Sequence, residues 1–164
     1  LDIFKELGNK AGISSSLHHI GIIHQYQGEY AKALEKFERS LEINKELGDK
    51  NGISKSHHEI GIIHQSQGEY VKALEMFVKS LEIKKELGDK AGIAASIGQI
   101  GQILEEKEDY KGAMKNYVTA LSIFTELKSP NQEITKNNLF QLLSKIGKDK
   151  FNEYLAEITE EMGQ

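Results

Sequence analysis

Apolar residues recur along this chain with the spacing of amphipathic helices. Between residues 70 and 87 most of them are three or four positions apart, which places them on one face of a helix: Tyr70, Ala73, Leu74, Phe77, Leu81 and Leu87. The preceding segment places Ile53, Ile60 and Ile63 at helical spacing as well. Gly68 interrupts the pattern between the two segments. The sequence therefore predicts a pair of helices separated by a turn at Gly68.

The sequence pattern of this helix pair occurs three times along the chain. The segment 11–50 is repeated, at roughly three positions in four, as residues 51–90, and a more diverged copy covers residues 91–128. A period of 40 residues indicates one supersecondary unit that stacks on copies of itself, with contacts mainly between neighbours. We therefore expect one repeat in each of these three segments.

The junctions between the copies carry signals for helix ends. Gly48 suits the left-handed residue that ends a helix, and Asp49 suits the N-cap of the next helix. In the third copy Glu108 and Asp109 replace the Gly-Glu pair of the turn inside the repeat. We expect this turn to survive the replacement.

Residues 1–10 match residues 41–50 and 81–90. We interpret them as the tail of a preceding repeat, so that the chain is a piece of a longer or processed array. The alternative is a native half-repeat that caps the N-terminal end.

Residues 129–164 depart from the repeat. Ser129 and Pro130 predict an N-cap followed by the first residue of a helix, which Gly147 closes, and Asp149 can cap a last helix. We interpret this segment as a degenerate fourth repeat or a C-terminal capping helix pair, since terminal repeats are usually atypical.

Composition narrows the function. The chain of 164 residues is 38% hydrophobic and carries a formal charge of −4, which argues against broad contact with nucleic acid or with an anionic membrane surface. It contains no cysteine, so neither a disulfide nor a thiolate site can form. This is compatible with a reducing compartment, and we expect a cytoplasmic protein. No apolar run is long enough to cross a bilayer.

The repeats resemble the tetratricopeptide repeat. The family signature of a large apolar residue, Leu-Gly and Tyr, followed by Ala and Phe, is matched here by Leu17-x-x-Ile20-Gly21-x-x-His24 and Ala33-x-x-x-Phe37. The later copies place Gly61 and Gly101 at the position of Gly21. The resemblance implies an all-α fold, a right-handed superhelix of antiparallel helix pairs. The 40-residue length, without the usual proline, is similar to the long-helix repeats of spindle-orientation adaptors and of many prokaryotic regulatory arrays.

Members of that family are mostly binding modules, so the resemblance implies recognition of a protein or peptide on the concave face of the first helices. Carried over to this sequence, the positions that line this face and the basic group nearby give a candidate groove: His18, Ile22, Gln25, Tyr26, Lys55, His58, Ile62, Gln65, Gln102 and Glu105. Ile22, Ile62 and Tyr26 would hold apolar side chains. The histidines and glutamines would bind the peptide backbone, and Glu105 would favour a basic residue.

Two questions about these residues stay open at the level of sequence. Ile22 and Ile62 can equally pack against the neighbouring repeat. Protonation of His18 and His58 near pH 6 is expected to weaken a groove that takes a basic peptide.

The remaining histidines favour packing over metal binding. His24 and His64 occupy a position that is Leu104 in the third copy, so we interpret them as half-buried spacers. No histidine pair has the i, i+4 spacing of a helical metal site. A zinc site would need His18 together with His58 from stacked helices, and no further ligand is clearly placed. We expect no metal and no cofactor.

Catalysis has little support, because the sequence has neither a glycine-rich phosphate loop nor a nucleophile set with supporting spacing. We expect a protein–protein interaction scaffold and not an enzyme, with a protein or peptide ligand and no nucleic-acid or membrane partner.

Two alternative functions remain. One is a sensor or regulatory segment of a larger signalling protein. The other is a structural array that self-associates end to end through its truncated N-terminal repeat.

Overall fold

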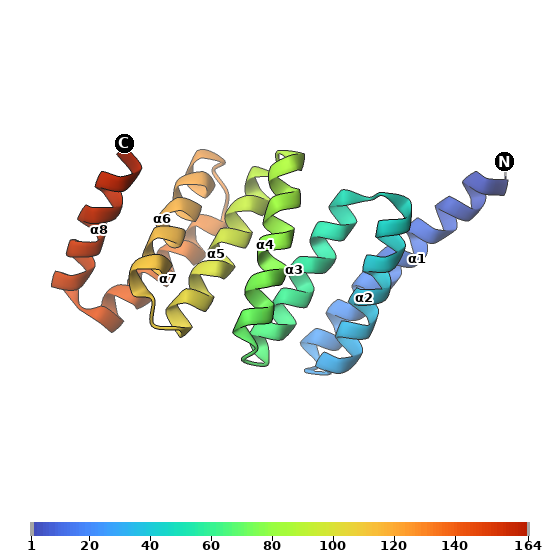
Figure 1. Ribbon diagram of the computed structural model, residues 1–164, viewed down its shortest axis with the longest axis horizontal. Coiled ribbons are helices and arrows are strands. Elements are labelled where there is room, and N and C mark those ends of the chain that lie inside the picture. Colours follow the sequence, from blue (N-terminus) through green and yellow to red (C-terminus); the bar gives the residue numbers. More distant parts are fainter. Residues whose placement is uncertain (1, 164) are drawn as a thin grey trace. The chain divides into compact units, whose positions relative to one another are not determined.

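The computed structural model describes residues 2–163, and their side chains from Gly8 onward. Over this range the chain forms eight α-helices joined by short turns, without a strand (Figure 1). The helices are α1 (Asp2–Tyr26), α2 (Tyr30–Leu47), α3 (Lys50–Ser66), α4 (Tyr70–Leu87), α5 (Lys90–Glu106), α6 (Tyr110–Glu126), α7 (Asn131–Ile146) and α8 (Lys148–Gly163).

The helices group into two compact units, Leu1–Gly88 and Asp89–Gln164. In the first unit each helix packs on the next one along the chain, from α1 to α4. In the second unit α5 packs on α6 and α6 on α7, while α8 contacts both α6 and α7. Within each unit, short turns make the two helices of a repeat antiparallel (Figure 1). The all-α class of antiparallel helix pairs that the sequence predicts is therefore confirmed.

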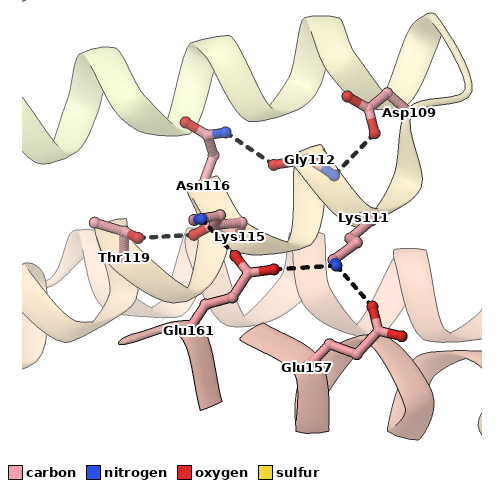
Figure 2. A network of polar contacts seen from close by, with 8 residues as sticks. All are labelled: Asp109, Lys111, Gly112, Lys115, Asn116, Thr119, Glu157 and Glu161. Carbon is pink, nitrogen blue, oxygen red and sulfur yellow. Dashed lines mark hydrogen bonds and ion pairs between the residues drawn. The ribbon is translucent and has the colours of Figure 1, made fainter. Parts of the chain in front are cut away.

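The predicted helix ends are confirmed at the repeat junctions. Gly48 has φ of 68°, and the Asp49 carboxylate accepts a hydrogen bond from the backbone N–H of Gly52 at 3.0 Å. Inside the third repeat Glu108 takes over the left-handed position, with φ of 63°, and Asp109 caps α6 (Figure 2). The turn survives because a carboxylate cap stabilises the helix start even though a non-glycine residue is strained at this φ.

Helix α1 behaves differently at the same register. It continues as a helix through Gly8, whereas Gly48 and Gly88 end α2 and α4 in the left-handed conformation. Residues 2–10 thus form the first turns of α1. Their assignment to the tail of a preceding repeat stays a prediction.

Close helix crossings explain the small residues of the repeat. A Cβ atom added to Gly21 would lie 2.6 Å from the Phe37 ring, and one added to Gly61 would lie 2.8 Å from the Phe77 ring. Both rings are fully buried. The glycine lets the second helix bring its aromatic ring against the backbone of the first, as expected for close packing of two helices.

A buried polar cluster links the two helices of the first repeat. The Ser14 hydroxyl lies 2.9 Å from that of Ser40 and donates a hydrogen bond to the Asn44 side-chain oxygen at 2.7 Å. All three residues are buried, and their hydrogen bonds offset the loss of water. In the third repeat the equivalent positions are apolar: Ala94, Ala120 and Phe124.

The closing pair starts at slightly different residues from those predicted. Helix α7 begins at Asn131, whose backbone N–H donates to the Ser129 hydroxyl at 3.3 Å. Helix α8 begins at Lys148, directly after Gly147, so Asp149 lies in its first turn and does not cap it. The capping prediction for Asp149 was wrong because Gly147, with φ of 83° and ψ of 160°, turns the chain within a single residue.

Helix α8 is held by one buried apolar side chain and by ion pairs at the rim. Ile158 is fully buried in a cluster with Met114, Tyr117 and Leu142. Around it the Lys111 amine reaches both Glu157 and Glu161, at 2.7 and 3.1 Å, and Lys115 reaches Glu161 at 2.7 Å (Figure 2). Among the described helices none has the length and hydropathy of a bilayer-crossing segment.

Candidate functional site

The first unit contains a groove between α1 and α3, the first helices of two successive repeats. Its volume is about 430 Å³. We call it the α1/α3 groove. It is lined by Ala11, Ser14, Ser15, His18, His19 and Ile22 of α1, by Ser40 and Asn44 of α2, and by Asp49, Asn51, Gly52, Lys55 and Glu59 of α3 and its cap. Three residues of the candidate set, His18, Ile22 and Lys55, are brought together here.

The floor of this groove is the polar cluster of the first repeat. Ser14 and Asn44 are buried, and their hydrogen bond ties α1 to α2 beneath the opening. Asn44 also lies against Gly52, where any Cβ would clash with the Asn44 amide. The floor is therefore packed and held in place, which lowers the conformational entropy that a ligand must overcome when it binds.

The walls carry one basic residue, Lys55, and two acidic residues, Asp49 and Glu59. Lys55 is exposed at the rim, and Glu59 is half-buried. Burial raises the pKa of the Glu59 carboxyl above its ordinary value, and Lys84 acts in the opposite direction. Burial is also the main reason that the pKa of His18 is lowered, with smaller effects from His19 and Lys55. His18 is thus a neutral hydrogen-bonding group at neutral pH.

His58 is packed more deeply than the sequence suggests. Its ring lies 5.4 Å from that of Phe77, in the same arrangement that His18 makes with Phe37. Burial, aided by Lys84, lowers the pKa of His58 to about 4. The prediction that His58 gains a proton near pH 6 was therefore wrong, because desolvation of the imidazole disfavours its charged form.

The other candidates of the first unit lie outside the α1/α3 groove. Tyr26, at the end of α1, is 89% exposed, and Gln25 is half-buried. Ile62 and Gln65 are half-buried on α3. The sequence left open whether Ile22 faces a ligand or packs inside the protein. In the structure Ile22 lines the groove and also packs against the core of the first unit.

In the second unit the candidates separate as well. The Glu105 carboxylate accepts a hydrogen bond from the Tyr117 hydroxyl at 2.9 Å and lies 3.5 Å from the Lys145 amine. These contacts join α5 to α6 and α7, so Glu105 has a packing role. Gln102 instead lines a smaller groove between α5 and α7.

This second groove, which we call the α5/α7 groove, has a volume of about 170 Å³. It is lined by Ala94, Ala95, Gly98, Gln99 and Gln102 of α5, by Phe124 of α6, and by Asn131, Ile134, Thr135 and Asn138 of α7. Its residues match those of the α1/α3 groove in the register of two repeats: Gly98 corresponds to His18 and Asn131 to Asn51.

Sequence reasoning missed several lining residues. His19, Glu59 and Gln99 share one register position in successive repeats, two residues after the first signature residue, and this position had not been assigned to the groove. Asn138 falls at the His18 position of the degenerate fourth copy. The repeat register could have found it if that copy had been aligned with the others.

Two histidines, which we interpreted as half-buried spacers, also contact glutamates at the turns inside the repeats. His24 pairs with Glu29 through its Nδ1 atom at 2.6 Å, and His64 pairs with Glu69 at the same distance. Each glutamate also accepts a hydrogen bond from a lysine three residues later. His57, by contrast, is buried, and burial lowers its pKa.

In the part of the chain that the structure describes, no group of three or more histidine, aspartate or glutamate side chains is placed to hold a metal ion. The two grooves offer hydrogen-bonding groups and apolar surface.

Comparison with known proteins agrees with this architecture. A family model described as the tetratricopeptide repeat matches residues 12–86 and 52–126, which together are more than half of the chain. A search of curated protein sequences finds no significant match.

Among solved structures, the apo form of RapI is similar over 90% of this chain, with a TM-score of 0.79 and 25% identity. This chain spans only 41% of RapI. The tetratricopeptide repeat domain of FLU from Arabidopsis is similar over 71% of this chain and 98% of its own length, with a TM-score of 0.67 and 26% identity.

BtubC from P. vanneervenii shares the fold over 98% of this chain and 75% of its own, with a TM-score of 0.71 and 17% identity. The helix pairs, the glycines at their crossings and the family match all agree. The chain belongs to the tetratricopeptide repeat family.

Proposed function

We propose that this protein is an interaction scaffold whose first unit binds a peptide segment of a partner protein in the α1/α3 groove. The single observation that carries the proposal is that His18, Ile22 and Lys55 converge on one groove of about 430 Å³. An apolar side chain of the ligand would lie on Ile22. Its polar groups would meet His18, His19 and Lys55 at the rim.

The volume of the α1/α3 groove is suited to a short peptide segment. A volume of about 430 Å³ falls within the range of roughly 300–1,000 Å³ that is usual for ligand pockets. Its lining combines the apolar side chain of Ile22 with polar and charged groups such as His18 and Lys55, which supports recognition of a ligand with both kinds of surface.

The wider site remains part of this proposal. In the first unit, a longer peptide that leaves the groove would run along the first helices past the residues expected there: Gln25, Tyr26, His58, Ile62 and Gln65. A cytoplasmic location, and the partners of any longer protein that contains this chain, are also predictions.

The test is selection from a displayed random-peptide library with the wild-type chain and with I22E. Ile22→Glu places a carboxylate on the apolar wall and should remove most captured sequences. The matched control is V71E, because Val71 is 76% exposed on α4 and does not line the groove.

Ile22 also touches the core, so a second variant protects the test against simple unfolding. K55E reverses the charge of an exposed rim residue and should change the selected sequences in favour of basic residues. If I22E and K55E both select the same peptides as the wild type, the α1/α3 groove is not the binding site.

One observation favours end-to-end self-association as a second function. On α1 the side chains of Ile20 and Ile23 are 41% and 55% exposed, whereas their counterparts Ile60 and Ile63 on α3 are 5% and 0% exposed. The counterparts are buried in a cluster that includes α2 residues. A helix from a second copy could cover the α1 face as α2 covers that of α3.

A further inference from the structure

The α5/α7 groove differs from the α1/α3 groove in charge. No lysine, arginine, aspartate, glutamate or histidine lines it. Lys55 is replaced in register by Thr135, and His19 is replaced by Gln99. A charged ligand group that entered this groove would lose water without gaining a counter-ion, which is unfavourable. The groove therefore favours an uncharged ligand.

Three side-chain amides of the groove are available for hydrogen bonding. Within the described part of the chain, the side chains of Gln99, Asn131 and Asn138 show no hydrogen bond, although all three line the same groove. An amide side chain offers both a donor and an acceptor, which is the pattern that a peptide backbone presents. Three amides in one groove can therefore bind the N–H and C=O groups of an extended peptide ligand, which are unpaired in the absence of a partner strand.

The floor of the groove is apolar where that of the α1/α3 groove is polar. Ala94 and Phe124 occupy the positions of Ser14 and Asn44, and both are buried. Ala94 and Phe124 thus offer no hydrogen bond to a polar side chain, and they can accept an apolar one. The hydroxyl of Thr135, which is also buried in this lining, already donates to the Asn131 backbone carbonyl at 3.3 Å.

Gly98 leaves room above this floor. In the first two repeats the equivalent residues, His18 and His58, lay an imidazole against the aromatic ring of the second helix. At Gly98 that side chain is missing, and a Cβ atom built there would meet nothing within 4 Å. A ligand side chain can occupy the space that an imidazole fills in the other repeats.

We propose that the α5/α7 groove is a second binding site, which takes an uncharged, extended peptide segment. The amides of Gln99, Asn131 and Asn138 bind its backbone, and one apolar side chain of the peptide occupies the space beside Gly98, over Ala94 and Phe124. This site is separate from the α1/α3 groove and, unlike that groove, has no charged lining residue.

The test uses the whole chain, isotope-labelled for NMR, and capped pentapeptides Ac-Ala-Ala-Xaa-Ala-Ala-NH₂ with Leu, Lys or Glu at the centre. We expect the leucine peptide to shift the side-chain amide signals of Gln99, Asn131 and Asn138, with a Kd of about 1 mM. The lysine and glutamate peptides should bind about tenfold more weakly or not at all. Binding of the leucine peptide should be unchanged between about 50 mM and 500 mM salt, because no ion pair is involved.

A substitution at Gly98 separates binding from folding. G98H restores the residue found in the first two repeats, so the helix should remain stable while the imidazole fills the space, and binding of the leucine peptide should fall by about tenfold. The matched control is G98A, whose small Cβ enters open space and should leave binding within about twofold of the wild type.

Three results would overturn the proposal. One is the absence of any shift at Gln99, Asn131 and Asn138 with the leucine peptide. Another is equal binding of the leucine, lysine and glutamate peptides. The third is unchanged binding by G98H. I22E, which tests the α1/α3 groove, should leave these shifts intact, so failure of one site does not imply failure of the other.

Discussion

At the scale of the residue, glycines at the helix crossings set how closely the two helices of a repeat approach. Gly61 and Gly98 lie on first helices in similar sequence surroundings, but their environments are opposite. A Cβ on Gly61 would meet the Phe77 ring at 2.8 Å, and one on Gly98 would meet nothing within 4 Å. The same substitution should therefore have opposite effects at the two positions.

We predict that G61A lowers the free energy of unfolding by about 1–2 kcal/mol. Overpacking against a fully buried ring costs roughly 1–3 kcal/mol, which exceeds the gain of about 1 kcal/mol in helix propensity from glycine to alanine. G98A should raise the free energy of unfolding by about 0.5–1 kcal/mol, because only the propensity changes. Urea denaturation of both variants checks this, and shifts of the same sign would contradict it.

His58 gives a prediction about pH. Its pKa is lowered to about 4 in the folded chain from an ordinary value of 6.5, so between these values the unfolded chain binds the proton more tightly. Stability should therefore fall as the pH decreases from about 6.5 to about 4, by at most roughly 3 kcal/mol from this residue. His18 and His57, whose pKa values are also lowered, act in the same direction. Glu59, whose pKa is raised, acts in the opposite direction.

Comparison of the wild type with H58Q isolates this contribution. Urea denaturation at several pH values should show a smaller loss of stability with acid for H58Q than for the wild type. H19Q, which removes an exposed imidazole of α1, is the control. If H58Q and the wild type lose stability in parallel between pH 6.5 and pH 4, the imidazole of His58 is not buried in its neutral form.

At the scale of the element, α8 shows how apolar burial and ion pairs share the docking of a helix. Only Ile158 of this helix is buried, while Lys111, Lys115, Glu157 and Glu161 form pairs at its rim with side chains between 39% and 51% exposed (Figure 2). Pairs with this exposure contribute little each because water screens them. The buried side chain should therefore dominate the docking.

We predict that I158A destabilises the docked α8 by about 2–4 kcal/mol, as expected for removal of a fully buried isoleucine. The double variant K111E/K115E should destabilise it by clearly less than I158A, and E157K/E161K combined with it should restore most of that loss. Hydrogen exchange of the α8 amides measures both effects. A larger effect from the charge reversal than from I158A would show that ion pairs hold the helix.

Sequence signals located most of these elements. Gly48 and Asp49 predicted a helix end and a helix start because each has a local conformational preference that few neighbours can override. The start of α8 was misplaced at Asp149, since a residue suited to capping does not show where the chain turns. That turn depends on Gly147 and on where Ile158 must pack.

At the scale of the whole molecule, the exposed apolar face of α1 is the surface through which we propose that copies associate. We predict that the wild-type chain associates in a concentration-dependent manner through Ile20 and Ile23, and that I20K/I23K is monomeric in sedimentation equilibrium. V71K, at a residue that is 76% exposed on α4, is the control and should still associate. A wild-type chain that stays monomeric at all concentrations would contradict the prediction.

The repeat itself determined the fold from sequence alone. Helical spacing of apolar residues, glycines at the crossings and the 40-residue period predicted the helix pairs, because these patterns reflect local geometry and contacts between adjacent segments. They also placed His18, Ile22 and Lys55 on first helices, where the structure finds them lining one groove.

Only the tertiary structure decided which side chains share a groove and in what state of charge. Glu59 lines the α1/α3 groove and Asn138 lines the α5/α7 groove because helices from different repeats approach each other there. The lowered pKa of His58 depends on burial, which sequence spacing does not report. Local conformational preferences determine where the helices begin and end. The desolvation of buried side chains and their convergence on one groove arise only when the helices pack.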